Sequence, residues 1–478
     1  MSSISFFCNL AEVTTPLPHF WEHTVGSDHA PMALRADWQQ QLQQCHNDLG
    51  FKHVRFHGLL SDDMGTLVLA DNKLLYSFIN IDQVFDFLLA IDVKPFVELS
   101  FMPEAIASGK RTVFSYEANV TPPRDYRQWG TLINRLVSHW VERYGLAEVR
   151  KWLFEVWNEP NLKAFWTGTQ RDYFKLFRYA AEAIKQVDSS LQVGGPATAR
   201  SEWIADFVDY CERNKVPADF ISTHHYPTDG FESDIETELQ LSKSQRGIMR
   251  EVAQNTRCQA RGRPVYYTEW NSSSNDRDPL HDESYAAAFA VSTVMEAKGL
   301  VEGYSFWTFS DIFEESYFPS RPFHGGFGLL TLHGIPKPTY RAFELLRQLG
   351  REQYLVDGLH ETVDCSVMRD DLSVTILLTN YTTPGHAIET EQVEIRLDNA
   401  PKPVSANIQR IDAEHVNPKR LWCEMGQPEY LSHKDVERLQ DATLLVSEKQ
   451  SLEYNEGSVV LKTSLPPQAV AALTIEFG

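Results

Sequence analysis

The sequence has few cysteines, too few basic residues to balance its acidic ones, and no long apolar run. Each shortage excludes a class of protein. The six cysteines are scattered without a C-x-x-C pair, which favours reduced thiols over a disulfide framework or a zinc site. Acidic residues outnumber basic ones by 65 to 44, and a net charge of −21 repels nucleic acid. No apolar run reaches the roughly 18 residues that a membrane span needs.

The start of the chain lacks both a basic segment and a long apolar segment, so it carries no recognisable secretory signal. Together with the reduced cysteines, this predicts a cytoplasmic protein. We expect no metal, no cofactor, no nucleic-acid partner and no membrane partner, while a homo-oligomer stays open. Aromatic residues make up 12% of the chain, which is on the high side. Aromatic rings serve both as core and as flat platforms for ligands.

Strand-like and helix-like segments alternate between residues 19 and 350. The expected strands are 20–25, 53–58, 94–100, 151–157, 191–195, 220–225, 264–270 and 303–309. Apolar residues spaced three and four apart predict helices within 34–49, 126–144, 174–184 and 285–295. Eight strands alternating with helices predict an α/β fold, a (β/α)₈ TIM barrel. A doubly wound sheet is the competitor, but the Gly-rich phosphate turn that it normally needs is missing.

The pattern changes after residue 350. Strand-like runs follow at 363–368, 372–379, 392–397, 404–411, 457–462 and 469–477, with one short helix near 434–439. This predicts a C-terminal β-sandwich domain over 351–478. Residues 1–18 hold an apolar strand at 4–8 and a Pro-containing linker, and we expect that strand to join the β-sandwich because the barrel has no place for it.

Two of the predicted barrel strands end in a carboxylate. The fourth breaks into Trp157-Asn158-Glu159-Pro160, where proline cannot continue a central strand. The seventh ends in Thr268-Glu269-Trp270-Asn271. The C-terminal ends of parallel barrel strands share one rim, so Glu159 and Glu269 are expected to face each other across its mouth. Two facing carboxylates can serve as an acid and a base or nucleophile.

Five motifs together resemble a known family. The chain is similar, over nearly its whole length, to glycoside hydrolase family 39, whose best known members are β-xylosidases and whose clan has catalytic glutamates at the ends of strands four and seven. The motifs are Val54-Arg55-Phe56-His57-Gly58, Trp157-Asn158-Glu159-Pro160-Asn161-Leu162, Thr268-Glu269-Trp270-Asn271, the 306–315 segment FWTFSDIFEE, and His324-Gly325-Gly326-Phe327-Gly328 leading to HGIPKP at 333–338.

The resemblance implies a retaining glycosidase with Glu159 as general acid/base and Glu269 as nucleophile. Such an enzyme needs its two carboxyls about 5–5.5 Å apart. Glu159 then needs a raised pKa to hold its proton, and the charge of Glu269 supplies part of that rise until Glu269 is esterified.

The resemblance also implies a set of substrate-binding residues. Asn158 is expected to bind the sugar 2-OH, His224 and Tyr226 match an H-x-Y motif in which the tyrosine keeps Glu269 ionised, and His57, Trp307 and Glu314 are expected to line the sugar pocket. The leading expectation is an exo-acting β-D-xylosidase that acts on small xylo-oligosaccharides.

Each assignment has a structural alternative. Glu159 could cap the next helix, and Glu269 could form a buried ion pair with an arginine of the second strand. His57 could be a satisfied core polar group and Trp307 a core residue, and Glu314 could lie in a solvated acidic loop. A metal at His224 and His225 is disfavoured, because neighbours on a strand point to opposite faces.

Alternative functions keep the fold and change the ligand. The same mechanism could act on an arabinoside, a glucoside or an iduronide, or in the interior of a polymer. A uronate would call for converging Lys or Arg, and only Arg55 is near, expected to point into the barrel. A non-catalytic carbohydrate-binding barrel is the remaining alternative.

Overall fold

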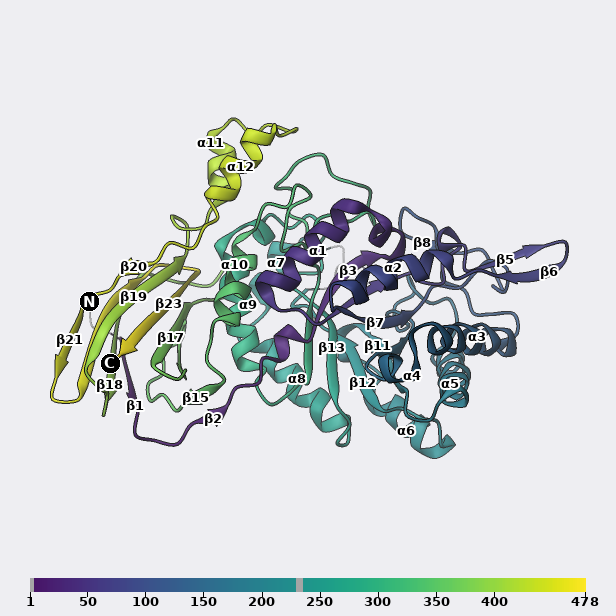
Figure 1. Cartoon of the computed structure of the whole chain (residues 1–478), viewed down its shortest axis with the longest axis horizontal. Helices are drawn as coiled ribbons and strands as arrows, with labels where there is room; N and C mark the ends of the chain where they lie inside the picture. The colour runs from purple at the N-terminus through teal and green to yellow at the C-terminus, as the bar shows by residue number, and fades with distance from the viewer. Residues whose placement is uncertain (1–3, 229–234) are drawn as a thin grey trace.

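The computed structural model describes residues 4–228 and 235–478. Eight parallel strands close into a barrel in which neighbours around the ring follow one another along the chain, with helices outside it (Figure 1). This confirms the predicted (β/α)₈ barrel. The strands are β3 (Thr24–His29), β4 (His53–His57), β7 (Lys94–Leu99), β10 (Leu153–Val156), β11 (Gln192–Thr198), β12 (Phe220–His224), β13 (Val265–Trp270) and β14 (Gly303–Phe306).

The first barrel strand differs from the prediction of 20–25. Phe20–Glu22 is a 3₁₀ turn, and the strand begins only at Thr24, which pairs with His53. Phe20 is buried in that turn and packs near Tyr304, with ring centroids 6.4 Å apart. A helical turn packed against the barrel can bury an aromatic side chain as completely as a strand can. The apolar residues at 20–25 therefore did not show where the strand begins.

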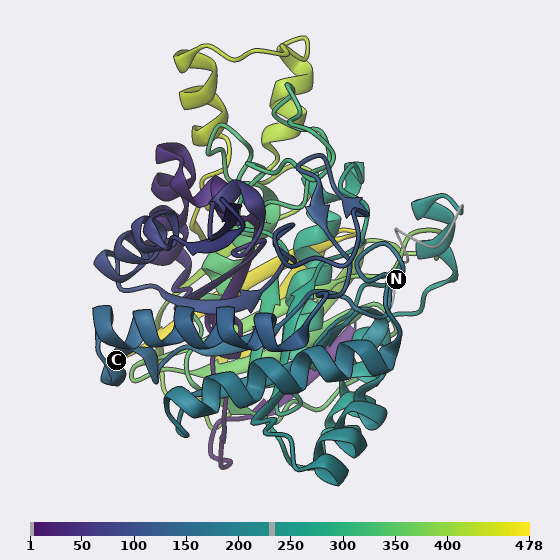
Figure 2. The same ribbon diagram turned by 90° about the vertical axis from the view of Figure 1, so that its right-hand side faces the viewer.

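Helices cover the barrel. They are α1 (Ala36–Leu49), α2 (Ile79–Ala90), α3 (Tyr126–Tyr144), α4 (Leu146–Val149), α5 (Gln170–Val187), α6 (Ile204–Asn214), α7 (Thr237–Lys243), α8 (Ile248–Gln259), α9 (Ser284–Glu296) and α10 (Pro338–Arg347). The side chain of Asp125 caps the N-terminus of α3 by accepting from the Arg127 N–H. Thr169 and Asp172 form a capping box on α5. Figure 2 shows α3 and α5 side by side across the face of the barrel.

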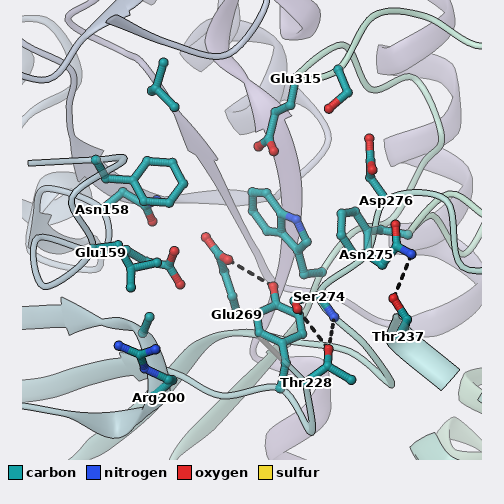
Figure 3. A pocket seen from close by; sticks show the side chains of 18 of the residues that line it. Asn158, Glu159, Arg200, Thr228, Thr237, Glu269, Ser274, Asn275, Asp276 and Glu315 are labelled. Carbon is teal, nitrogen blue, oxygen red and sulfur yellow. Dashed lines mark hydrogen bonds between the residues drawn. The ribbon is translucent and has the colours of Figure 1, made fainter. Parts of the chain in front are cut away.

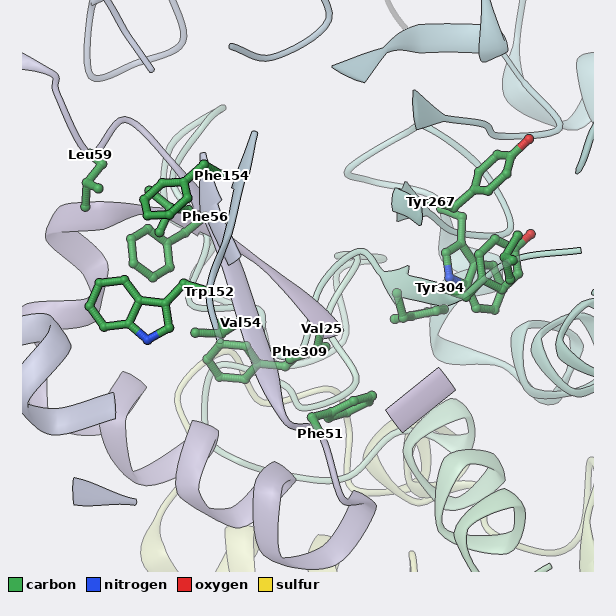
Figure 4. Packing of buried hydrophobic residues seen from close by; sticks show 14 of the residues in the cluster. Val25, Phe51, Val54, Phe56, Leu59, Trp152, Phe154, Tyr267, Tyr304 and Phe309 are labelled. Carbon is green, nitrogen blue, oxygen red and sulfur yellow. The ribbon is translucent and has the colours of Figure 1, made fainter. Parts of the chain in front are cut away.

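Alternation along the strands separates the core from the site. On β4, Val54 and Phe56 belong to the large apolar core, part of which is drawn in Figure 4. The intervening Arg55 points into the barrel instead, where it meets carboxylates of other strands. The N-terminal end of the barrel interior is filled by an apolar cluster of Phe96, Leu153, Phe220 and Tyr266. Chemistry is therefore confined to the opposite end.

The C-terminal segment forms two facing sheets, as predicted for a β-sandwich. One sheet has the order β1 (Ile4–Asn9), β18 (Glu391–Asp398), β22 (Ser458–Leu465), β21 (Leu452–Asn455). The other has the order β2 (Thr15–Pro16), β15 (Glu352–Tyr354), β16 (Val363–Arg369), β17 (Ser373–Asn380), β23 (Ala469–Phe477), β19 (Pro403–Ile411), β20 (Glu448–Lys449). The N-terminal strand pairs in parallel with β18, which confirms where it was expected to go.

The second sheet is apolar on both faces. Ile376 and Leu378 of β17 point into the sandwich core, whereas Leu377 joins the core of the barrel. β23 divides in the same way, with Leu473 on the inner side and Val470 on the barrel side. Burial on both faces explains why these strands are nearly continuous apolar runs.

Several short elements project from this frame. They are the hairpins β5 (Leu67–Ala70) with β6 (Lys73–Tyr76) and β8 (Thr112–Val113) with β9 (Ala118–Asn119), the 3₁₀ turns η2 (Ala30–Leu34), η3 (Asp62–Met64), η4 (Ala199–Ser201) and η5 (Pro279–Asp282), and the helices α11 (Pro418–Glu424) and α12 (His433–Asp441). The sequence predicted only the second of these helices. Among the described residues, no helix combines the length and the apolar character that crossing a membrane requires.

Candidate active site

A cavity of about 700 Å³ opens at the rim where the barrel strands end, and Figure 3 shows the side chains that line it. Six residues predicted from the sequence line the cavity. They are Glu159, Asn158, His57, Tyr226, Glu269 and Trp307. His224 lies behind Glu159 and contacts it.

Glu159 and Glu269 are close neighbours at this rim. A carboxylate oxygen of each, together with a ring nitrogen of His224, lies within 4.8 Å of the others. Glu159 leaves the strand through a sharp turn, with left-handed backbone at Trp157 (φ 74°) and at Glu159 itself (φ 42°). Its N–H donates to the carbonyl of Ala197 on the neighbouring strand at 2.8 Å. The turn explains how a residue after the end of β10 faces the barrel axis.

Arg55 occupies the centre of the barrel beneath the two glutamates. Its guanidinium is fully buried and contacts Glu155 at 2.5 Å, Glu98 at 2.7 Å and Glu269 at 2.8 Å. It also donates to Asn158 Oδ1 at 3.0 Å. Burial alone would lower the pKa of Arg55. The charges of Glu155, Glu98 and Glu269 raise that pKa by more than burial lowers it, so the guanidinium stays charged.

Glu269 accepts hydrogen bonds on both oxygens. Arg55 donates to Oε1, and the phenol of Tyr226 donates to Oε2 at 3.0 Å. Burial raises the pKa of Glu269, and the charges of Arg55 and His57 oppose that rise. The pKa of Tyr226 is well above its ordinary value, because of burial and then the nearby Glu269 charge, so the phenol remains a donor. Both partners favour the ionised carboxylate.

The hydrogen bonds of His224 fix where a proton lies. Burial lowers the pKa of His224 well below 6.5, so the ring is neutral. Thr268 gives its hydroxyl proton to Glu155 at 2.7 Å and therefore accepts from His224 Nε2 at 3.1 Å. The other nitrogen, Nδ1, is then an acceptor, and it lies 3.0 Å from Glu159 Oε1. A proton on Glu159 is needed to make that hydrogen bond.

Three further residues complete the inner wall. His57 Nδ1 lies 2.7 Å from Glu98, and Nε2 is 3.6 Å from Glu269. The indole of Trp307 is tilted beside His57, with ring centroids 4.8 Å apart. Asn158 Nδ2 is buried without a hydrogen-bond partner among the described residues, so it can donate to a ligand.

Comparison with known proteins follows this geometry. The model of glycosyl hydrolases family 39 matches residues 8–459. The chain belongs to this family. It is 49% identical over 466 residues to a β-xylosidase of Caldicellulosiruptor saccharolyticus, with 96% of each chain covered. It is 37% identical to a β-xylosidase of Geobacillus stearothermophilus, covering 95% of this chain and 92% of that one. A solved family 39 β-xylosidase of Caulobacter crescentus superposes with a TM-score of 0.84 at 32% identity, covering 99% of each chain.

One residue predicted for this family 39 pocket lies elsewhere. Glu314 does not line the cavity; its carboxylate lies 3.1 Å from His29 Nε2. The lining residue is its neighbour Glu315, whose Oε1 is 3.5 Å from His57 Nε2. Burial raises the pKa of Glu315 well above 4.5, and the charges of Asp28 and Glu269 add to the effect. Two adjacent glutamates in a loop offer no periodicity that tells which one faces inward.

Glu98 and Glu155 were not singled out from the sequence. Each lies inside a barrel strand and is fully buried against Arg55. Their signal was available, because a charged residue within a buried parallel strand needs a partner of opposite charge. The ion pair of Glu269 with an arginine of the second strand, considered as a structural alternative, exists in the structure. It lies beside the cavity, so it is compatible with a reactive carboxylate.

The paired motifs at 324–328 and 333–338 form one unit. The ammonium of Lys337 is fully buried and contacts Asp282 at 2.8 Å, Asp311 at 2.7 Å and the carbonyl of Gly326 at 2.8 Å. The second oxygens of the two aspartates accept from the N–H groups of Gly325 and Gly328. These bonds hold the loop that carries Phe327 into the cavity wall.

Two groups of described residues have the spacing of metal ligands: Glu159, His224 and Glu269, and Asp28, His29 and Glu314. In the first, Arg55 lies 2.8 Å from Glu269 and would repel a cation. In the second, both ring nitrogens of His29 face carboxylates. A protonated histidine satisfies that arrangement without a metal.

Proposed function

We propose that this enzyme is a retaining, exo-acting β-xylosidase that releases xylose from the non-reducing ends of xylo-oligosaccharides. Glu269 attacks the anomeric carbon while Glu159 protonates the departing oxygen, and Glu159 then removes a proton from the water that hydrolyses the glycosyl ester. Asn158, beside the acid/base, is expected to bind the sugar 2-OH. The names of the two similar β-xylosidases support the choice of sugar.

The observation that carries the mechanism is a close pair of carboxyl groups with different hydrogen-bond partners. One oxygen of Glu159 and one of Glu269 lie within 4.8 Å of each other. Retaining enzymes need about 5–5.5 Å between the two carboxyls, whereas inverting ones need roughly 6.5–9.5 Å to admit a water. Glu269 accepts from Arg55 and Tyr226, as a nucleophile should. The hydrogen bond to His224 supports Glu159 as the residue that holds the proton.

The charge of the cavity supports a neutral sugar. Its described lining includes Glu236, Asp276 and Glu315 besides the two reactive glutamates, and its one arginine, Arg200, lies 3.1 Å from Glu202. A uronate would need basic side chains converging on the sugar carboxylate. A pentose such as xylose makes no such demand.

The cytoplasmic location remains a prediction, and the oligomeric state stays open. The six cysteines are all free thiols, which supports a reducing compartment.

A panel of nitrophenyl glycosides tests the proposal. We expect the wild type to hydrolyse the β-xyloside best, ahead of the arabinoside, the glucoside and the iduronide, and Glu269→Ala to lose activity by several orders of magnitude. The exposed Glu437→Ala is the matched control and should keep full activity. Absence of xyloside hydrolysis would rule out xylose as the sugar. Full function in Glu269→Ala would show that Glu269 is not catalytic and would favour a carbohydrate-binding barrel.

Two product analyses complete this experiment. Proton NMR of the first product should show β-xylose before mutarotation, because two displacements preserve the configuration. With xylohexaose, the first products of exo cleavage should be xylose and xylopentaose. First-formed α-xylose would contradict retention. Xylobiose, xylotriose or xylotetraose appearing before xylopentaose would contradict exo action.

A further inference from the structure

His29, the last residue of β3, lies at the centre of a cluster of carboxylates beside the sugar pocket. Its Nδ1 is 3.5 Å from Asp28, and its Nε2 is 3.2 Å from Asp63 and 3.1 Å from Glu314. The ring stacks on Tyr116 with centroids 3.7 Å apart and planes 4° from parallel. Nε2 makes a hydrogen bond with Asp63, whereas Nδ1 makes a charge contact with Asp28 and no hydrogen bond within the described residues. Carboxylates on both sides of the ring favour the imidazolium over the neutral form.

This cluster joins loops from different strands. Asp28 and His29 end β3, Asp63 lies in η3 after β4, Tyr116 lies between β8 and β9, and Glu314 follows β14. In a chain with an excess of acidic residues, three carboxylates around one ring repel each other unless the ring is charged. Arg35 is the other cation that acts on Glu314. The charge of His29 offsets this repulsion at the point where the loops meet.

The peptide that the cluster holds carries Glu315 into the pocket. The Glu314 N–H donates to Asp28 Oδ2 at 2.7 Å, and the Ser115 hydroxyl donates to the Glu314 carbonyl. The Ser115 N–H donates to the Glu315 carbonyl at 2.8 Å. With its backbone fixed, Glu315 points into the space shared with Glu159 and Glu269 (Figure 3). Its Oε1 is buried, lies 3.5 Å from His57 Nε2 and makes no hydrogen bond within the described residues, so it can accept one from a ligand.

We propose that His29, as an imidazolium held between Asp28, Asp63 and Glu314, is a positioning residue that sets the place of Glu315 in the sugar pocket. The inference rests on the proposed glycosidase function. His29 does not line the cavity, so it acts through Glu315. Loss of its charge should loosen sugar binding more than it slows bond cleavage, since the reactive glutamates are held separately by Arg55, Tyr226 and His224.

The charge of His29 has a defined pH range. Burial works against the imidazolium, but its contacts with Asp28 and Asp63 raise the pKa of His29 to about 9. The group is charged below that pH, and its hold on Glu314 is lost as the pH rises through about 9. Wild-type KM should therefore rise near that pH.

The experiment measures kcat and KM from pH 6 to 10 on the glycoside that the wild type hydrolyses best. His29→Gln, which cannot carry charge, should raise KM about tenfold at pH 7, change kcat less than threefold, and lose the alkaline rise in KM. Adding Glu314→Gln should recover part of the affinity, because it removes one repelling carboxylate. The exposed His433→Gln is the matched control and should behave as wild type.

A second measurement does not depend on activity or on the variant folding. Wild-type protein with isotope-labelled histidine should show one imidazole that titrates near pH 9 by NMR, assigned to His29 by through-bond correlation to the backbone of the wild type. An imidazole of His29 that titrates near 6.5, a KM that stays flat to pH 10, or a loss confined to kcat would overturn the proposal. Failure of the proposed sugar specificity would appear separately, as a wild type that prefers a glycoside other than the xyloside.

Discussion

Two buried cations of this barrel, Arg55 and Lys337, are each surrounded by carboxylates, but they face different surroundings. Lys337 contacts Asp282 and Asp311, and the second oxygens of both aspartates accept from backbone N–H groups. Arg55 contacts Glu98, Glu155 and Glu269, and the last of these lines the cavity. In the Lys337 cluster every charged group contacts another part of the chain. In the Arg55 cluster one carboxylate, that of Glu269, also faces the cavity.

The difference separates stability from chemistry. A buried charge pair contributes little net stability when intact, but removing one partner leaves an uncompensated charge. In the Lys337 cluster that cost falls on the loop that carries Phe327. In the Arg55 cluster the same electrostatics oppose the rise in the pKa of Glu269 that burial causes. The two clusters should therefore respond differently to the same chemical change.

The largest effect is expected from matched amide substitutions, one in each cluster. Glu269→Gln removes the proposed nucleophile, so kcat/KM should fall on the order of 10⁴-fold or more. The melting temperature should change little, because Arg55 keeps its contacts with Glu98 and Glu155. Asp311→Asn removes one charge from the Lys337 cluster, so it should lower the melting temperature and leave kcat/KM within about tenfold of wild type. Steady-state kinetics and thermal melts of both variants decide. The contrast would fail if the two variants lost activity and stability in the same proportion.

A second prediction tests the Lys337 cluster alone. Lys337→Met keeps the length of the side chain but leaves Asp282 and Asp311 buried without a cation, so the free energy of unfolding should fall by about 3–5 kcal/mol. Urea unfolding measures it, with the exposed Lys434→Met as control. A loss under about 1 kcal/mol would mean that water or protonation relieves the two aspartates.

The sequence predicted the barrel well because its strands end in recognisable breaks. The fourth strand, β10, ends at Val156, close to the break predicted from Pro160, and Glu159 lies in the turn between them at the rim. The first strand was misplaced, because buried aromatics such as Phe20 and Trp21 carry no mark that separates a strand from a 3₁₀ turn. Helix α11 was missed for a similar reason, since only Trp422 and Pro418 of its seven residues are buried.

The candidate site was predicted less completely than the fold. Residues at strand ends, such as His57 and Trp307, line the cavity as expected. The choice between Glu314 and Glu315 depended on a loop whose direction is set by Asp28 and Ser115, far apart in the sequence. Long-range contacts of this kind leave no local pattern, whereas strand ends do.

The smallest expected effect concerns Tyr226, which donates to Glu269 from the cavity side. As the proposed nucleophile, Glu269 must be ionised, so kcat/KM should fall as the pH drops through its pKa. Burial raises the pKa of Glu269 above its ordinary value of 4.5. The midpoint of the acid-side fall in kcat/KM should therefore lie above pH 4.5. Tyr226→Phe removes a donor that favours the charged form, so the acid limb should move to higher pH by on the order of one unit. The exposed Tyr430→Phe should leave the profile unchanged. An acid limb that stays in place or moves to lower pH would show that Tyr226 does not lower the pKa of Glu269. The difference between the two clusters would then rest on the charges of Arg55 and His57.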